Sequence, residues 1–217
     1  ALTYAIIGGN TGDAFKINAT TGEIQVNDAS AIDFETLDSY TLSVSVTDPE
    51  GEVDTASIAI AVSDVNEAPS VSLVNPTNTI AENTDTSSAI KIADIVISDD
   101  ALGTNTLSLT GADAGSFEIV GTELRLKAGE VLDFETQETY DVSVQVDDAG
   151  VGATPDDTAV HPFAVTNVNE TPLIVFGEGN KSYTENAARI IIDASATVTD
   201  PDLSDFDTGT LTVSFTA

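Results

Sequence analysis

The residues of this chain that are best suited to chemistry carry oxygen in their side chains and fall in short clusters. Residues 62–69, Val-Ser-Asp-Val-Asn-Glu-Ala-Pro, contain Asp64, Asn66 and Glu67 and end in Pro69. Calcium takes about six to eight oxygen ligands and accepts carboxylates, amides and backbone carbonyls. The segment can therefore be a plain linker or part of a site for a hard cation.

The run before this segment is typical of a strand. Ile58, Ile60 and Val62 are two residues apart, with small residues between them. This alternation predicts a half-buried strand. Pro69 cannot donate a ladder hydrogen bond, so we expect the strand to end before it. The oxygen-rich segment would thus join one folded unit to the next.

The composition excludes several classes of protein. The 217 residues include 6 basic and 37 acidic side chains, a net charge of −31. Nucleic acid and anionic membrane surfaces are therefore unfavourable partners. The chain has no Cys for a disulfide or thiolate site, and its single His is too few for an imidazole zinc site. No apolar run approaches the ~20 residues of a membrane-spanning helix. The absence of Met indicates a processed product or a segment of a longer protein.

Five landmarks recur in the same order at a period near one hundred residues. Such self-similarity is typical of tandem repeats. We therefore divide the chain into repeat one (1–69), repeat two (70–171) and repeat three (172–217). The landmarks are Asp-Phe-Glu-Thr at 33–36 and 133–136, alternating strands from Tyr40 and Tyr140, Val-Asn-Glu at 65–67 and 168–170, Glu-Asn at 82–83 and 185–186, and Phe-x-Ile at 15–17 and 117–119.

Each repeat is predicted to be all-β. The segment 20–23, Thr-Thr-Gly-Glu, lies between two short apolar runs, which indicates a hairpin, and Gly121-Thr122-Glu123 is placed in the same way. About seven short alternating strands per hundred residues suggest tandem Greek-key sandwiches of immunoglobulin type. No stretch has a helical period. Since 41% of the residues are hydrophobic, disorder is not expected.

The first and third repeats are incomplete in this sequence. Repeat one opens at a position that aligns with Leu107 of repeat two, so its first strand is missing. Repeat three holds material for only the first two strands. The sequence allows two interpretations: a tandem array that has been cut, or strand exchange in which the leading strands of repeat three complete repeat one of another copy.

Acidic residues gather where repeats one and two are joined. The loops of a sandwich lie at its two ends, so loops from both repeats should converge on the linker. Without a cation such a group of carboxylates would repel itself. The candidate ligands at this first junction are Asp33, Glu35, Asp64, Asn66, Glu67, Asp99, Asp100, Asp147 and Asp148.

These landmarks together resemble the cadherin repeat over essentially the whole chain. The family pattern has a Glu at the end of the first strand, an Asp-x-Asp before the second, a Leu-Asp-x-Glu in mid-domain, an Ala-x-Asp after a long strand and an Asp-x-Asn-Asp-Asn-Pro linker. The matching segments here are 81–83 and 184–186, 200–202, 32–35 and 132–135, 46–48 and 146–148, and 64–69.

The resemblance implies a cadherin-like sandwich with calcium between domains, which stiffens an extracellular rod that often serves adhesion. The acidic, Cys-free sequence looks like the bacterial tandem arrays of large surface proteins. The resemblance also assigns ligands in repeat three and at the second junction. These are Glu82, Asp133, Glu135, Asn167, Asn169, Glu170, Glu185, Asp200 and Asp202.

The sequence departs from the family pattern at several positions. The linker has Glu67-Ala68 in place of Asp-Asn, and Asp99-Asp100-Ala101 replaces Asp-x-Asp, which removes one expected ligand position. The second linker begins with Asn167 in place of Asp, which lowers the charge and thus the expected calcium affinity. The first junction lacks the upstream Glu. Asp48 belongs to a junction before residue 1 and should bind nothing here.

The sequence disfavours an enzyme. No Cys is present, and His161 replaces the strand residue Ile58, so we expect it to be partly buried rather than catalytic. Pro162 predicts an edge strand. Tyr40 and Tyr140 occupy the alternate strand positions that face the core, so we expect them to be core residues. Paired carboxylates can hydrolyse glycosides, but Asp33 and Glu35 recur in repeat two as Asp133 and Glu135, which favours chelation.

We therefore expect an extracellular, calcium-binding segment of an adhesin or structural rod, whose partners are calcium, neighbouring repeats and other copies of itself. Two alternatives remain. One is a filament or surface-layer subunit that assembles by strand exchange. The other is a polysaccharide-binding module, which would need an exposed aromatic or Thr platform; aromatic residues are only 6% of the chain.

Overall fold

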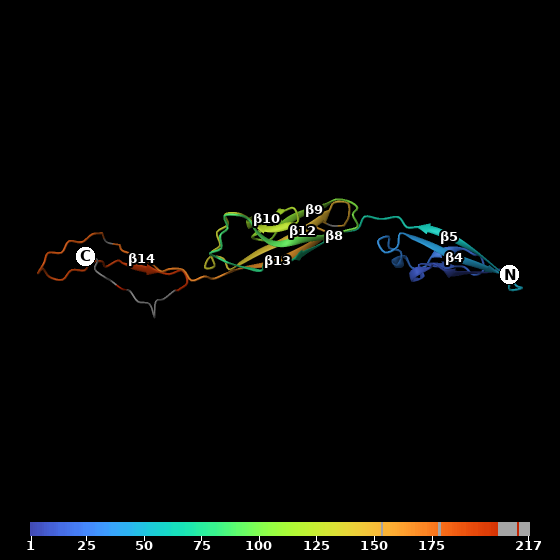
Figure 1. Ribbon diagram of the computed structural model, residues 1–217, viewed down its shortest axis with the longest axis horizontal. Helices are drawn as coiled ribbons and strands as arrows, with labels where there is room; N and C mark the ends of the chain where they lie inside the picture. The colour runs from blue at the N-terminus through green and yellow to red at the C-terminus, as the bar shows by residue number, and fades with distance from the viewer. Residues whose placement is uncertain (153, 178, 204–211, 213–217) are drawn as a thin grey trace. The chain divides into compact units, whose positions relative to one another are not determined.

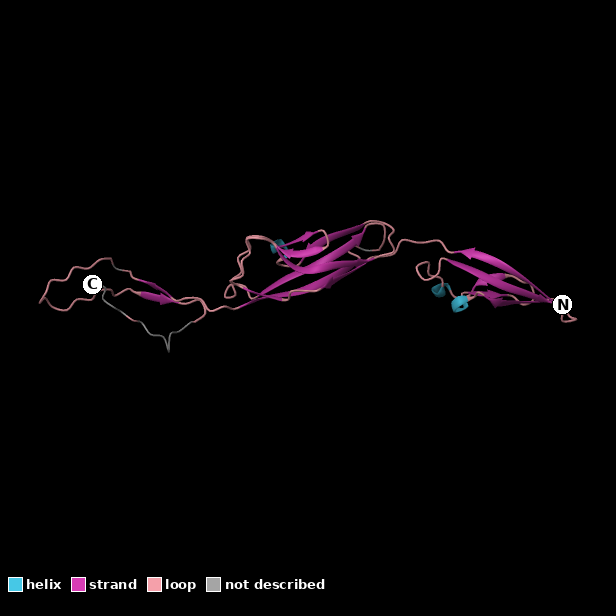
Figure 2. Cartoon of the chain, viewed as in Figure 1, coloured by secondary structure: helices cyan, strands magenta, loops and turns pink. Residues whose placement is uncertain are grey.

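The computed structural model confirms the all-β class (Figures 1 and 2). The structure describes residues 1–152, 154–177, 179–203 and 212. Contacts divide the chain into two compact units. Unit 1 comprises Ala1–Pro69 with the loops Ser98–Asn105 and Asp147–Asp156, and unit 2 comprises Ser70–Ile97, Thr106–Val146 and Asp157–Ala217. The segment 62–69, which contains the first linker (64–69), thus forms one compact body with two loops of repeat two.

Repeat one consists of a three-stranded antiparallel sheet in the order β1-β4-β5 and the hairpin β2-β3. The hairpin confirms the turn expected at residues 20–23. The element bounds are β1 (Thr3–Gly8), η1 (Thr11–Asp13), β2 (Phe15–Ile17), β3 (Ile24–Val26), η2 (Ala29–Ala31), β4 (Ser39–Thr47) and β5 (Val53–Ala61).

Repeat two forms two four-stranded sheets, in the orders β10-β11-β8-β6 and β7-β13-β12-β9. The pairing of β7 with β13 is parallel, whereas β12 and β13 are antiparallel. The bounds are β6 (Ser70–Val74), β7 (Thr79–Ala81), β8 (Ile90–Ser98), β9 (Asn105–Thr110), η3 (Ala114–Ser116), β10 (Phe117–Val120), β11 (Glu123–Leu126), β12 (Thr139–Asp148) and β13 (Asp157–Thr166).

The two repeats share the strands β1–β5 and β9–β13, in the same order and pairing. Repeat two adds β6, β7 and β8 in front of them, so three strands, rather than the single strand expected, have no counterpart in residues 1–69. In repeat three, β14 (Leu173–Val175) pairs antiparallel with β15 (Thr197–Thr199). The part of repeat three beyond residue 203, apart from residue 212, lies outside the described residues.

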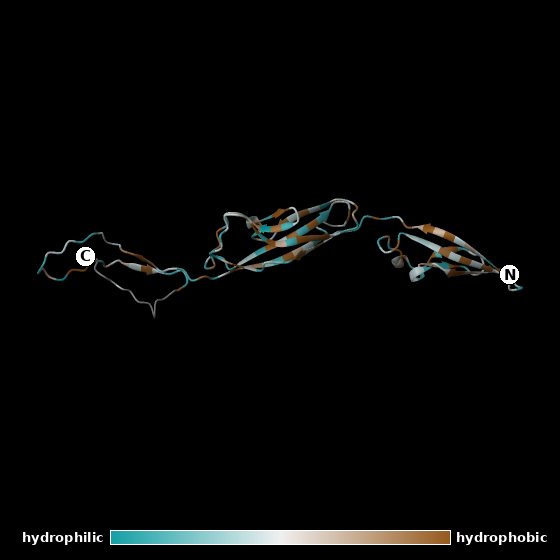
Figure 3. Ribbon diagram, viewed as in Figure 1, coloured by the Kyte–Doolittle hydropathy of each residue, from teal (hydrophilic) through white to brown (hydrophobic). Residues whose placement is uncertain are grey.

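Strand β4 of repeat one and β13 of repeat two bury side chains at alternate positions, whereas β5 is exposed at every residue except Ile60, which is half-buried. Figure 3 shows how hydropathy alternates along the strands. Tyr40 and Tyr140 are buried, which confirms the prediction that they belong to the core. Each packs edge-on against a Phe: Phe15 with Tyr40 at 5.1 Å between ring centroids and Phe117 with Tyr140 at 6.1 Å. The same aromatic pair therefore anchors both repeats.

The prediction that Pro162 marks an edge strand is wrong. Strand β13 lies between β7 and β12, and Pro162 is opposite Asp141 of β12. The proline is tolerated because β7 pairs only with residues 164–166, so position 162 lies beyond that ladder.

Candidate metal centres

The first cluster of carboxylates lies in unit 1. Glu35, Asp64 and Asp100 each offer an oxygen, and these oxygens lie within 4.8 Å of one another. Glu35 comes from the turn after η2, Asp64 from the linker after β5, and Asp100 from the loop between β8 and β9. Three segments far apart in sequence thus present acceptors to one point.

Local hydrogen bonds hold these segments in place. Asp100 Oδ2 accepts the backbone N–H of Glu67 at 2.8 Å, which ties the linker to the β8–β9 loop. Asp33 accepts both the backbone N–H and the hydroxyl of Thr36, at 3.2 and 3.0 Å, which fixes the turn that carries Glu35. Asp100 therefore belongs to the cluster although it departs from the Asp-x-Asp pattern.

A second group of oxygens in unit 1 centres on Asp148, which is 3% exposed. Its carboxylate accepts the N–H groups of Gly150 and Thr104 and the side-chain amide of Asn66, at 2.9, 3.2 and 3.2 Å. The Gly150 hydrogen bond is the main reason that the pKa of Asp148 lies below its ordinary value. Gly103 packs so closely that a Cβ there would lie 1.7 Å from Asp148 Oδ2.

Several buried oxygens in unit 1 have no hydrogen-bond partner, and unpartnered buried polar atoms are costly unless something binds them. Asn105 belongs to this set and was missed by the sequence analysis, because one Asn at the start of a strand carries no motif of its own. Its amide nitrogen donates to Asp99 Oδ2 at 2.6 Å, which leaves its oxygen free. The unpartnered oxygens are Oδ1 of Asp64, Asn66, Asp99, Asn105 and Asp147.

The second linker, residues 167–172, lies in unit 2 beside two clusters that share a residue. Glu82, Asp133 and Glu135 form one group, and Glu135, Glu170 and Asp202 form the other, each with oxygens within 4.8 Å. Asp202 Oδ2 accepts the N–H of Glu170 at 2.6 Å, as Asp100 does with Glu67. The two linkers therefore use the same backbone contact.

Glu82 links two further segments at this second site. Its Oε2 accepts the N–H of Phe134 at 2.8 Å, and its Oε1 accepts the N–H of Val168 at 2.6 Å. Asn167, which replaces the leading Asp, donates its amide to Glu135 Oε1 at 2.8 Å. The carboxylate of Glu82 thus connects the linker to the 133–137 turn.

Repulsion between neighbouring carboxylates affects the pKa values of the glutamates in these clusters. Burial, together with Glu82, Asp202 and Glu135, raises the pKa of Glu170 to about 7. Burial and the charges of neighbouring carboxylates likewise raise the pKa of Glu135. A backbone hydrogen bond lowers the pKa of Glu35, but burial and the charges of Glu67 and Asp64 outweigh it and raise the pKa overall. Bringing carboxylates together disfavours their ionised forms.

The remaining predicted ligands are less closely assembled. Asn169 donates its amide to the Glu170 carbonyl, and Asp200 accepts the N–H of Asp202, so both shape the second linker. Glu185 is exposed and belongs to none of the clusters found among the described residues. Asp48, which was not expected to be a ligand here, accepts the backbone N–H of Glu52 in a turn.

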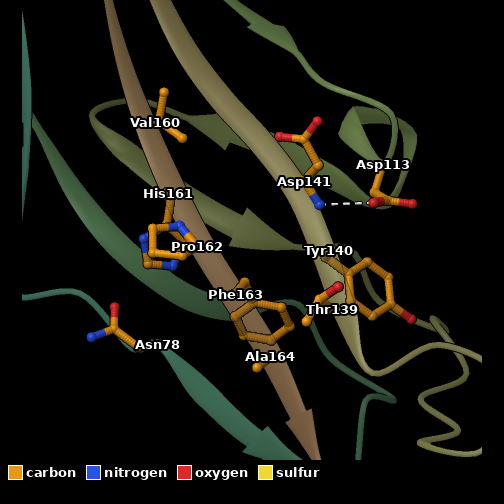
Figure 4. Close-up of a pocket in the computed structure, with 10 residues that line it drawn as sticks. All are labelled: Asn78, Asp113, Thr139, Tyr140, Asp141, Val160, His161, Pro162, Phe163 and Ala164. Atoms are coloured by element: carbon orange, nitrogen blue, oxygen red, sulfur yellow. Dashed lines mark hydrogen bonds between the residues drawn. The ribbon is translucent and has the colours of Figure 1, made fainter.

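The groove along β12 and β13 in unit 2 offers no catalytic arrangement among the residues that line it (Figure 4). His161 is buried, as predicted, and its Nε2 lies 3.1 Å from the Thr77 carbonyl oxygen. Burial lowers its pKa. Asp113 accepts the N–H of Asp141, which occupies its carboxylate. No helix among the described residues meets the length and hydropathy required to cross a membrane.

Residues 1–63 match the family model described as the Cadherin domain. Protocadherin Fat 4 of Mus musculus is 33% identical over 155 residues, 69% of this chain and 3% of that protein. Protocadherin Fat 1 of Homo sapiens is 31% identical over 157 residues, with 69% and 3% covered. A structure of Protocadherin Gamma B2 extracellular cadherin domains 1–5 has a TM-score of 0.63 and 26% identity, and the match covers 93% of this chain and 39% of that one.

The family match and the relatives support the cadherin domain family, and the fold is the cadherin-like sandwich of protocadherin ectodomains. The chain is similar to extracellular cadherin repeats of protocadherins. It spans only 3% of the length of the curated relatives named here. These relatives are animal proteins, and they support neither the expected bacterial origin nor filament formation.

Proposed function

We propose that this segment is a calcium-dependent structural part of an extracellular adhesion protein. Calcium ions would bind beside the two linkers, 64–69 and 167–172. Bound there, they fix each linker to loops that are distant in sequence. Hinge motion at the linkers is then lost, and the string of repeats becomes a rod that can present an adhesive surface.

The observation that supports this proposal most strongly is the set of buried oxygens without partners. In unit 1 they lie on Asp64, Asn66, Asp99, Asn105 and Asp147, and in unit 2 Oε2 of Glu170 is a further example. Burying such atoms without a partner is unfavourable, and calcium accepts this mixture of carboxylate and amide oxygens. The donor set thus fits a hard cation.

The residues that would hold calcium follow from the clusters. At the first linker these are Glu35, Asp64 and Asp100, together with the unpartnered oxygens of Asn66, Asp99, Asn105 and Asp147. At the second linker they are Glu82, Asp133, Glu135, Glu170 and Asp202. Calcium supplies positive charge, which neutralises carboxylates that otherwise repel one another.

Isothermal titration of the 217-residue chain with calcium, after treatment with a chelator, tests this function. We expect saturable binding in the micromolar to millimolar range that magnesium does not reproduce, because magnesium demands stricter octahedral geometry. Glu35→Gln should weaken the binding, whereas Glu52→Gln, an exposed acid outside the clusters, should leave it unchanged. Equal weak binding of both cations, insensitive to Glu35→Gln, would show that the carboxylates are an ordinary acidic surface.

A further inference from the structure

Three segments of the sequence have the pattern Asn-x-Ser/Thr, which accepts asparagine-linked sugars in exported proteins. They are residues 18–20 (Asn-Ala-Thr), 169–171 (Asn-Glu-Thr) and 180–182 (Asn-Lys-Ser). A pattern this short also arises by chance. The surroundings of each asparagine amide therefore decide which of the three triplets can carry a sugar on the folded chain.

The first triplet lies in the loop of the hairpin that β2 and β3 form in repeat one. The backbone of Asn18 closes this loop, because it donates to the Glu23 carbonyl and accepts the N–H of Gly22, both at 2.8 Å. Gly22 has a φ of 76°, and a Cβ there would lie 3.1 Å from the ring of Tyr4. The loop therefore has a defined conformation and packs against β1.

The side-chain amide of Asn18 uses its oxygen within the loop and leaves its nitrogen accessible. Its Oδ1 accepts the backbone N–H groups of Thr20 and Thr21 at 2.9 and 3.1 Å. None of the hydrogen bonds found among the described residues uses its Nδ2. Asn18, Ala19 and Thr20 are all exposed. The nitrogen that would receive a sugar is thus open to solvent, in the same loop as the Thr20 hydroxyl that completes the triplet.

The second triplet is placed less favourably. Nδ2 of Asn169 donates to the Glu170 carbonyl oxygen at 3.0 Å, so the acceptor nitrogen is engaged. Glu170 also donates its backbone N–H to Asp202 and belongs to a carboxylate cluster with Glu135 and Asp202. A sugar on Asn169 would therefore disturb the contacts that shape the second linker. In the third triplet Asn180 is exposed, but no hydrogen bond found in the described part of the chain orients its amide.

We propose that Asn18 is the attachment site of an asparagine-linked oligosaccharide. This inference rests on the proposed extracellular role, because such sugars are added to exported chains. In the transfer, Asn18 Nδ2 forms a bond to the anomeric carbon of a lipid-linked oligosaccharide diphosphate. The bond between that carbon and the diphosphate oxygen breaks, the diphosphate leaves with the electron pair, and Nδ2 loses one proton to a base of the transferase.

The position of the loop keeps this sugar away from the first linker. The Ala19 carbonyl accepts the N–H of Tyr4 at 3.0 Å, and Tyr4 lies opposite Val46 near the end of β4. Val46 in turn lies opposite Asp54 at the start of β5, whereas the linker follows the end of β5 at Ala61. The strand between these two ends is roughly 20 Å long, at about 3.3 Å per residue. The sugar therefore shields one end of repeat one and leaves the candidate calcium ligands open.

Secretion of the full chain from cultured animal cells, with an added signal peptide, tests the proposal. Mass spectrometry of peptides from the secreted chain measures the occupancy of each triplet. Asn18 should carry an oligosaccharide on most molecules, whereas Asn169 should remain largely unmodified. A secreted chain with no sugar on Asn18, or with higher occupancy at Asn169 than at Asn18, overturns the proposal.

Two neighbouring threonines provide a matched pair of variants. Thr20→Ala destroys the triplet but keeps Asn18 and the backbone N–H groups that its Oδ1 accepts. Thr21→Ala removes a hydroxyl from the same loop outside the triplet. Thr20→Ala should abolish the modification, Thr21→Ala should retain it, and Thr20→Ser should restore it. Retention of the sugar in Thr20→Ala, or its loss in Thr21→Ala, contradicts the proposal.

Calcium titration before and after enzymatic removal of the sugar separates this proposal from the calcium function. Because Asn18 lies at the opposite end of the sheet from the first linker, calcium affinity should not change measurably. A chain that binds calcium but carries no sugar on Asn18 overturns only the modification. A chain that carries the sugar but binds no calcium supports the modification and overturns only the calcium function.

Discussion

The two linkers have the same backbone arrangement but different charge. In each, the linker Glu donates its N–H to an Asp of the following repeat, Asp100 or Asp202, at 2.8 and 2.6 Å. The first linker begins with Asp64, whose Oδ1 has no partner, whereas the second begins with Asn167, whose amide donates to Glu135. The fold therefore sets where the oxygens lie, and single side chains set how strongly they should attract a cation.

The largest effect is expected from a substitution that disrupts the calcium site at the first linker alone. In Gly103→Ala the new Cβ would lie 1.7 Å from Asp148 Oδ2 and 2.8 Å from Asn66 Oδ1, so both side chains must move. We expect calcium affinity at the first linker to fall roughly tenfold or more, since ligands are displaced, while the second linker is unchanged. Calcium titration measures both.

Gly121→Ala is the control for backbone strain in this experiment. Gly121 has a φ of 62°, close to the 70° of Gly103, but no atom lies within 4 Å of its Cβ position. Both variants carry a side chain at positive φ. Equal losses of calcium affinity in the two variants would mean that strain, and not the contact with Asp148, is responsible.

The second linker can be broken by Glu82→Gln. This change removes a charge and leaves one of the N–H groups of Phe134 and Val168 without its acceptor, because an amide side chain has a single oxygen. We expect a loss of calcium affinity at the second linker of roughly tenfold. Glu185→Gln, the equivalent change at an exposed residue of repeat three, should have no effect; if it does, net charge rather than ligation controls binding.

Exchanging the first residues of the two linkers should change their calcium affinities by a smaller amount. Asp64→Asn removes one carboxylate from the first linker, and Asn167→Asp adds one to the second. Calcium affinity follows the number of charged ligands, so we expect the first to fall and the second to rise by roughly severalfold. If both changes lower affinity, hydrogen bonding by the Asn amide matters more than charge.

The smallest expected difference is in pH dependence. The raised pKa of Glu170, about 7, exceeds its unfolded value of 4.5, so the calcium-free folded state holds its proton over that range. Ionisation therefore lowers stability as pH rises from about 4.5 to about 7 in the absence of calcium. Calcium must displace the proton, so affinity at the second linker should fall below pH 7.

The first linker provides the comparison for this pH effect. Although a backbone hydrogen bond lowers it, the pKa of Glu35 is also raised above its ordinary value, by burial and by the charges of Glu67 and Asp64. We expect calcium affinity at the first linker to decline at a lower pH than calcium affinity at the second linker. Melting curves with and without calcium from pH 5 to pH 8, for Gly103→Ala and Glu82→Gln, separate the two sites. Identical pH profiles for these variants would argue against a special role for Glu170.

The periodicity of the sequence predicted most of this fold. The alternation from Tyr40 and Tyr140 indicated the buried strands β4 and β12, and the Asp-Phe-Glu-Thr motif located the turns that carry Glu35 and Glu135. The parallel strand β7 is only three residues long, and its pairing with β13 joins segments far apart in sequence, so no local pattern could reveal it.

The candidate sites were predictable only in part. The motifs identified Glu35, Asp64 and Asp100, but they could not show that Glu185 would lie apart from the clusters or that Asn105 would point an unpartnered oxygen into unit 1. Both results depend on the path of loops, which single-residue motifs do not encode. The Asn167 amide likewise gains its role from a contact with Glu135 that lies 32 residues away.

Amide hydrogen exchange in calcium and in chelator tests the central claim most directly. The informative amides are those of Glu67 and Thr104 in unit 1 and of Val168 and Glu170 in unit 2, each of which donates to a carboxylate beside a candidate site. If calcium fixes the linkers, exchange at these amides should slow markedly when calcium is added, while the amides of β12 remain unchanged. Equal exchange rates with calcium and with chelator would contradict calcium-dependent stiffening of the linkers.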